Sequence, residues 1–223
     1  MTLSKPHFDG HYQEEATLAD GSRVHLRFVR PEDKARLQAA FEKLSPESRY
    51  LRFFSHKQTL TDAELEVLTN VDGDHHVAIG AALDGPGGEL VPLGVARFVR
   101  LADEPAVAEA AIVVVDRFHG RGLGTLLLQR LAAAALERGI TTFRCEFFVH
   151  NHKVRRLLEN MAPSLKLEVD GDVMKVEIPV PSIDRGQPPT RIDRDTPLFH
   201  LLGQSAQGAI ELRLRRLLLK IKE

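Results

Sequence analysis

Hydrophobic and polar residues alternate along several short segments, and this two-residue period predicts β-strands. The clearest segment is Val24 to Val29, where Val24, Leu26 and Phe28 fall on one side of the predicted strand. Asp20-Gly21 lies just before it and predicts a hairpin turn. Further strands are expected over 76–83, 93–101, 106–116 and 141–149, and in a hairpin on either side of Asp170-Gly171.

Apolar residues recur at helical spacing in segments between these strands. Proline at a first helical position predicts helices from Pro31 and after Ser45, and the capping box Thr61-Asp-Ala-Glu64 predicts another that runs to about Asn70. Longer helices are expected over 123–138, where Gly139 ends the pattern, and over about 151–161. The interleaved helices and hairpins predict an α/β (α+β) fold with a mixed, mostly antiparallel sheet.

The composition changes after residue 180. Residues 181–205 are rich in proline and charge and are interpreted as a linker, while 206–223 predict an amphipathic helix. We therefore expect one folded domain over 1–180. The terminal helix packs on that domain or on a second subunit, which permits a homodimer; a position on a membrane surface is the alternative.

Composition excludes several classes of protein. The 30 Lys and Arg residues are balanced by 31 Asp and Glu residues, which argues against a nucleic-acid-binding protein. Cys145 is the single cysteine, so no intramolecular disulfide is expected. No apolar run is long enough to span a membrane, and the first residues lack the apolar core of a signal peptide. A cytoplasmic location is the resulting expectation.

The segment IVVVDRFHGRGLGTLLLQRL carries the clearest chemical signal. A β-branched strand runs into Gly120, Gly122 and Gly124, and a leucine-rich helix begins at once. Glycines let the backbone turn sharply and let an anion approach the amides, and the first helical turn has unpaired N–H groups at the positive end of its dipole. Together they predict a pyrophosphate site. The spacing fits neither the dinucleotide fingerprint nor a P-loop.

This segment resembles the GCN5-related N-acetyltransferase (GNAT) family, in which the loop reads Gln/Arg-Gly-x-Gly-x-Gly/Ala; His119 stands in the first position here. The resemblance covers roughly residues 22 to 180. It implies acetyl-CoA as the co-substrate and a sheet of about seven strands flanked by helices. It also implies a V-shaped splay between the strands with Ile112 to Val114 and Phe143 to Val149, where the pantetheine arm threads. The implied cofactor-binding residues are Ile112, Val113, Val114, His119, Gly120, Arg121, Gly122, Leu123, Gly124, Thr125 and Asn151.

The run Leu44 to Phe54 resembles the catalytic domain of bacterial Pat-type protein lysine acetyltransferases. A lysine acceptor with a pKa near 10.4 is neutral only about once in 2,500 at pH 7, so a base must accept its proton. Glu109 is the candidate: it lies where the Pat-type pattern has its acidic residue, and a carboxylate among alanines and valines is expected to have a raised pKa. Glu104 and Asp116 are the less favoured alternatives.

The acid that protonates the departing thiolate is not assigned. Many family members use a tyrosine on the helix after Asn151, whereas the two tyrosines here are Tyr12 and Tyr50. Ala162-Pro163 replaces the family's Gly-Phe after that helix. Arg155 and Arg156 either form a solvated helix face or reach the cofactor's phosphates. No metal site is expected, because the spacing of His75-His76 and of His150 and His152 does not by itself assemble three ligands.

These residues favour an acetyl-CoA-dependent N-acetyltransferase that modifies a primary amine, preferably a protein lysine. Two alternatives stay open. One is acetylation of a small amine, such as an antibiotic or a polyamine. The other is an acyl-CoA-binding sensor without catalysis.

Overall fold

The structure, a computed structural model, describes residues 8–46, 49, 58–149 and 166–180. The helix expected from Asn151 lies outside the described residues, as do the linker over 181–205 and the terminal helix over 206–223. The helix expected after Ser45 lies mostly outside them.

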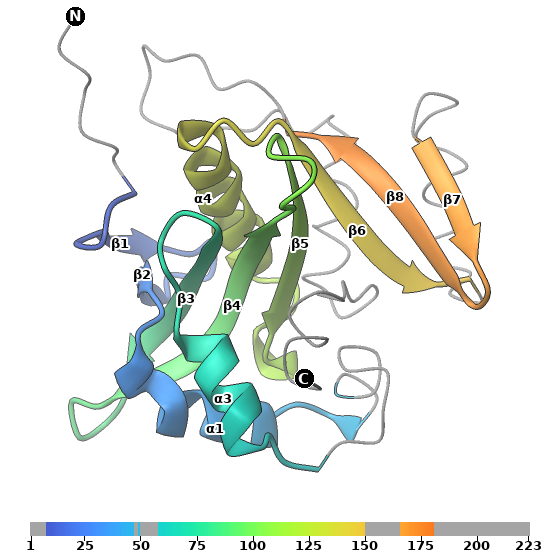
Figure 1. The fold of residues 1–223 in the computed structure, drawn as a ribbon. Helices are drawn as coiled ribbons and strands as arrows, with labels where there is room; N and C mark the ends of the chain where they lie inside the picture. The colour runs from blue at the N-terminus through green and yellow to red at the C-terminus, as the bar shows by residue number, and fades with distance from the viewer. Residues whose placement is uncertain (1–7, 47–48, 50–57, 150–165, 181–223) are drawn as a thin grey trace, which may run out of the picture.

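Eight strands form a single sheet in the order β1-β2-β3-β4-β5-β6-β8-β7 (Figure 1). Their bounds are β1 (Gln13–Thr17), β2 (Arg23–Phe28), β3 (His76–Asp84), β4 (Leu90–Arg100), β5 (Val107–Val114), β6 (Thr142–Phe148), β7 (Lys166–Asp170) and β8 (Val173–Pro179). All neighbours are antiparallel except β5 and β6, which are parallel. The predicted mixed, mostly antiparallel sheet is confirmed, with eight strands instead of about seven.

In the described ranges, three α-helices pack on the sheet: α1 (Lys34–Glu42), α3 (Asp62–Thr69) and α4 (Leu123–Glu137). In Figure 1, α4 covers one face of the central strands, and α1 and α3 lie against the other. The link between β5 and α4 is a short 3₁₀ turn, η2 (Asp116–Phe118), followed by the glycine loop. The sheet is therefore enclosed from both sides at its centre.

Local signals set the helix starts. Thr61 and Glu64 form the predicted capping box: the Thr61 hydroxyl accepts from the Glu64 amide, and the Glu64 carboxylate accepts from the Thr61 amide at 2.8 Å. The helix expected from Pro31 begins instead at Lys34, after a 3₁₀ turn, η1 (Pro31–Asp33). The Asp33 carboxylate accepts hydrogen bonds from the Arg30 amide and from the Arg27 side chain, and these bonds hold the tighter turn.

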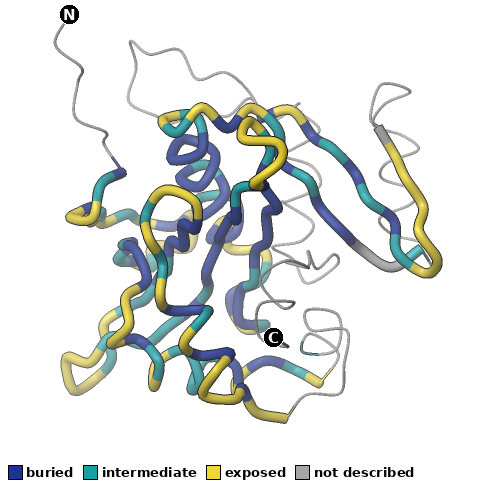
Figure 2. Tube along the Cα trace, viewed as in Figure 1, coloured by how far each residue is buried: buried dark blue, intermediate teal, exposed yellow. Residues whose placement is uncertain are grey.

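The core lies between α4 and strands β3 to β5, the dark blue region of Figure 2. Alanines 132 to 135 on α4 are all buried, and their small side chains let the helix approach the sheet closely. Phe98 and Phe143 pack with ring centroids 6.3 Å apart and join β4 to β6. Cys145 is fully buried in β6. Within the described ranges, no helix has the length and apolar character needed to cross a membrane.

Candidate active site

Strands β5 and β6 separate part-way along their length. Their parallel pairing covers three residue pairs and ends at Glu109 and Arg144. Beyond that point β5 stays paired with β4 to Val114, and β6 stays paired with β8 to Phe148. The two strands diverge visibly in Figure 1. The V-shaped splay expected from the sequence is therefore confirmed, and it lies at the position expected.

The backbone of β5 alternates between its two neighbours. The Leu101 amide donates to the Val107 carbonyl at 2.9 Å, and the Val115 amide donates to the Leu93 carbonyl at 2.8 Å. Because backbone groups of an antiparallel strand alternate in direction, the odd-numbered residues of β5 face β4. The even-numbered residues face the side of β6.

Past Glu109 this second side has no β6 pairing, so the backbone groups of Ala110, Ile112 and Val114 are directed into the opening. An extended chain with amide groups can pair with them as an added strand. Val113 differs, because its backbone is directed to Val95 of β4. Of the three strand residues expected to contact a cofactor, Ile112 and Val114 are thus the two whose backbone groups suit that role.

The glycine loop lies between the end of β5 and α4. Gly120 and Gly122 have φ values of 74° and 86°, a left-handed backbone that favours glycine. A Cβ placed on either glycine would meet no atom within 4 Å, so the space beside this backbone is open. Gly122 caps α4, and the Leu126 amide donates to its carbonyl at 3.0 Å. The amides of Leu123 to Thr125 come before this first helical hydrogen bond, so they have no acceptor within the helix. They lie at the positive end of the helix dipole.

Side chains in the loop hold its shape. The Nε2 atom of His119 lies 2.8 Å from the Val114 carbonyl oxygen. A carbonyl only accepts, so Nε2 carries the proton in this bond. Arg121 donates to Asp20 at 2.8 Å, and its guanidinium lies 4.8 Å from the centre of the Phe118 ring. The loop is thus tied to β5 and to the turn before β2.

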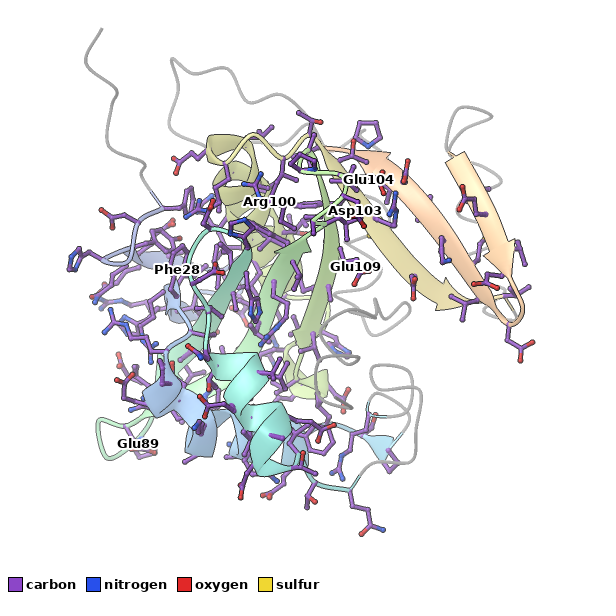
Figure 3. The ribbon with its side chains drawn as sticks, in the orientation of Figure 1. Phe28, Glu89, Arg100, Asp103, Glu104 and Glu109 are labelled. Carbon is purple, nitrogen blue, oxygen red and sulfur yellow. The ribbon has the colours of Figure 1, made fainter. Side chains whose placement is uncertain are left out.

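Glu109 lies at the point where the strands separate, and Figure 3 shows it on β5. Its side chain is 5% exposed. Burial raises the pKa of the neighbouring Cys145 thiol, and the charges of Glu109 and Glu146 raise it further. Both carboxylates therefore lie close to that thiol.

The two alternative acids have other partners. Glu104 accepts two hydrogen bonds from Arg144, at 2.9 and 3.0 Å, and Asp116 accepts one from the Ser45 amide at 2.8 Å. Arg144 also binds Glu177 through Nε at 3.0 Å. Hydrogen bonds to Glu104, and then to Glu177, raise the pKa of Arg144 above its usual range. Of the three acids, Glu109 is the one that lies in the last β5–β6 register pair.

An apolar cavity of about 120 Å³ lies between α1 and the sheet. Leu37 and Phe41 of α1 line it on one side, and Val95 and Val113 line it on the other. Val113 is four residues from Glu109, so their side chains lie on the same face of β5.

The sequence prediction and the observed site differ in two respects. Asn151, Arg155 and Arg156 lie outside the described residues, so their roles stay predictions. Glu146 was not anticipated, although it is 2% exposed on β6. The signal for it was a charged residue within the apolar run Phe143 to Phe148.

A mixed sheet that opens between two strands, beside a glycine loop at a helix start, is the architecture of coenzyme A-dependent N-acetyltransferases. The model of the acetyltransferase (GNAT) family matches residues 37–162, more than half of the chain. The chain therefore belongs to the GNAT family, whose members use acetyl-CoA as the acetyl donor.

Individual relatives agree with this assignment. The chain is 32% identical over 165 residues to Acetyltransferase Pat of Mycolicibacterium smegmatis, a match that covers 74% of this chain and 48% of that protein. The chain thus spans about half the length of this relative. The GNAT domain of PAT from S. lividans is similar with a TM-score of 0.63 and 29% identity, over 77% of this chain and 99% of that domain. The structure of yncA from Salmonella typhimurium with its cofactor acetyl-CoA shares the fold, with a TM-score of 0.51 and 17% identity over 76% of this chain and 99% of that one.

Proposed function

We propose that this protein transfers the acetyl group of acetyl-CoA to a primary amine, preferably the side chain of a protein lysine, with Glu109 as the base. The observation that carries the proposal is the end of β5–β6 pairing at Glu109 and Arg144. It brings a buried carboxylate, an opened strand edge and a glycine loop into one site. Family membership supports the reaction, and the likeness of Leu44 to Phe54 to Pat-type enzymes supports the lysine acceptor.

The residues present fit the cofactor. Its diphosphate is an anion, and the glycine loop, with left-handed Gly120 and Gly122, lies at the start of α4, where helix amides suit an anion. Its pantetheine arm carries amides that match the backbone groups of Ile112 and Val114. The yncA structure, which carries acetyl-CoA on the same fold, is consistent with this arrangement. Acetyl-CoA supplies the acetyl group as a thioester.

The acceptor approaches from the face of the sheet that carries Glu109. The ammonium group of the acceptor first gives one proton to Glu109, directly or through one water molecule. The neutral nitrogen then bonds to the acetyl carbonyl carbon, the carbon–sulfur bond breaks, and the second proton passes from the nitrogen to the departing thiolate or to water. The products are an N-acetylated amine and coenzyme A.

The one tyrosine in the part of the chain that the structure describes, Tyr12, does not protonate the departing coenzyme A. Tyr12 donates its hydroxyl hydrogen to Glu14 at 2.7 Å, beside β1. Burial, and then the hydrogen bond to Glu14, raise the pKa of Tyr12, so it is a poor acid. A thiol is itself acidic, with an ordinary pKa of about 8.5, so it leaves as a thiolate or takes a proton from water.

The test combines purified protein, acetyl-CoA, a lysine peptide library and a panel of small amines. The expected result is acetylation of peptide lysine, with one thiol released for each acetyl group transferred. Acetylation of small amines alone would contradict the protein acceptor. Tight cofactor binding with no acetylated product would favour the sensor alternative.

A further inference from the structure

Glu146 is a buried acid that the proposed base mechanism does not use. Its side chain is 2% exposed in β6. Among the residues that the structure describes, its Oε2 atom is buried and has no hydrogen-bond partner. A buried carboxylate is unfavourable unless it is paired or hydrogen-bonded, so this position calls for an explanation.

The pairing of β5 with β6 places Glu146 beside the opening between these two strands. Arg144 is the β6 partner of Glu109, and Glu146 follows two residues later, about 7 Å further along the strand. Alternate side chains share one face of a strand, so Glu146 and Glu109 lie on the same side of the sheet. The amide of Val149 donates to the Asp172 carbonyl, which directs the odd-numbered residues of β6 to β8. The backbone of Glu146 is therefore directed into the opening.

The basic side chains that the structure describes beside Glu146 on β6 and β8 contact other carboxylates. Arg144 binds Glu104 and Glu177. Lys175, the β8 partner of Glu146, donates to Asp170 at 3.4 Å. The two charges that raise the pKa of the Cys145 thiol, after burial, are those of Glu109 and Glu146, so the two carboxylates flank one point of β6.

We propose that Glu146 is an acceptor-binding residue whose carboxylate receives a hydrogen bond from the cationic amine before Glu109 removes a proton. The inference rests on the proposed function. An ammonium group has three donors, enough to contact both carboxylates. Two acids on one face of the opening select a cationic primary amine over a neutral alcohol or thiol, because the charge of the acceptor offsets that of the buried carboxylates.

The competing explanation is that Glu146 only fills space in the core and contacts no acceptor. Glutamate and glutamine side chains are nearly the same size. On that explanation Glu146→Gln leaves acceptor binding unchanged, so the two explanations predict different results.

The experiment measures acceptor affinity without turnover. Titration calorimetry follows a lysine-containing pentapeptide, and in parallel spermidine, binding to protein saturated with coenzyme A. We expect Glu146→Gln to weaken binding of the acceptor about tenfold or more, the scale of a lost hydrogen bond to a charged group. Glu146→Asp, which keeps the charge, should retain part of the affinity. Binding of coenzyme A itself should stay within about twofold, which also shows that the variants are folded.

Glu168→Gln is the matched control. Glu168 is exposed on β7, opposite Lys175, in the same row of the sheet as Glu146. The Glu168→Gln substitution removes the same charge at a position away from the opening, so it should leave acceptor affinity unchanged. Equal affinity of Glu146→Gln and wild type for both acceptors would overturn the inference, as would absence of acceptor binding by wild type. Turnover is assayed separately, so a protein that binds the acceptor through Glu146 but transfers no acetyl group contradicts the proposed function alone.

Discussion

Glu109 of β5 and Arg144 of β6 are the last residue pair at which these two strands are in register. The arginine is held by Glu104, in the loop before β5, and by Glu177 of β8. These hydrogen bonds tie β6 to β8 and to the loop before β5. Beyond Arg144, β6 follows β8, and no strand in the part of the chain that the structure describes pairs with this edge of β5. The proposed base and the proposed cofactor-binding residues Ile112 and Val114 lie on this one strand.

Replacing the proposed base should affect chemistry more than binding. Glu109→Gln removes the proton acceptor and keeps the size of the side chain, so turnover should fall by about 100-fold or more. Acetyl-CoA affinity, measured by calorimetry, should stay within about twofold. Glu168→Gln is the control, because Glu168 is exposed on β7 away from the opening, and it should retain most of the turnover. An unchanged rate for Glu109→Gln over about pH 6 to 9 would rule out this base.

A side chain at Gly122 should block the cofactor. Gly122 has a φ of 86° and open space where a Cβ would lie, so valine both strains the backbone and fills the space given to the diphosphate. Gly88, with a φ of 79° and the same open space, lies in the β3–β4 hairpin away from the site. Gly122→Val and Gly88→Val should lose similar stability, roughly 1–3 kcal/mol. Acetyl-CoA binding should be lost in Gly122→Val alone; retained binding there would refute the loop assignment.

The bond from His119 to Val114 should support the cofactor site indirectly. His119→Ala leaves the Val114 carbonyl without its donor and frees the loop from β5. Stability should drop by about 1 kcal/mol, the usual scale for one hydrogen bond. Acetyl-CoA affinity should fall several-fold. His119→Gln carries an amide donor and should recover part of both losses in denaturation and calorimetry; equal effects of Ala and Gln would argue against this bond.

Acid should weaken the fold through Asp33. Burial opposes its ionisation, but hydrogen bonds from Arg27, the Arg30 amide and Arg36 outweigh burial and lower its pKa from 3.8 to about 2. An acid whose pKa is lower in the folded state stabilises the fold when the pH is above its pKa in the unfolded state. This stabilisation is lost as the pH falls through the pKa of the folded state. Between about pH 4 and 2 the wild type should therefore lose roughly 2 kcal/mol that Asp33→Asn lacks. Urea denaturation across that pH range measures the free energy of unfolding, with the variant Asp172→Asn, at an exposed position, as the control. If wild type and Asp33→Asn lose the same free energy of unfolding as the pH falls, the prediction is contradicted.

Features encoded within a few residues were predictable from the sequence. The capping box of Thr61 and Glu64 and the positive φ of Gly21 and Gly171 depend on neighbours in the chain, and all appear where the pattern placed them. The alternation from Val24 to Phe28 likewise fixed which side chains are buried.

Features that join distant segments were not predictable. Arg121 binds Asp20 across 101 positions of the chain, and Arg130 binds Glu14 across 116. Such pairs depend on the order of strands in the sheet, and no local pattern records them. The burial of Glu146 is of the same kind, because it follows from the course of β6 beside β8. The start of α1 at Lys34 also depended on a contact, that of Asp33 with Arg27.

The most direct test of this account is a crystal structure with acetyl-CoA bound. We predict density for the diphosphate against the amides from Gly120 to Thr125. The pantetheine arm should pair with the backbone of Ile112 and Val114, and the thioester should lie beside Glu109. Density for the nucleotide at another position, or β5 and β6 hydrogen-bonded along their whole length, would contradict it.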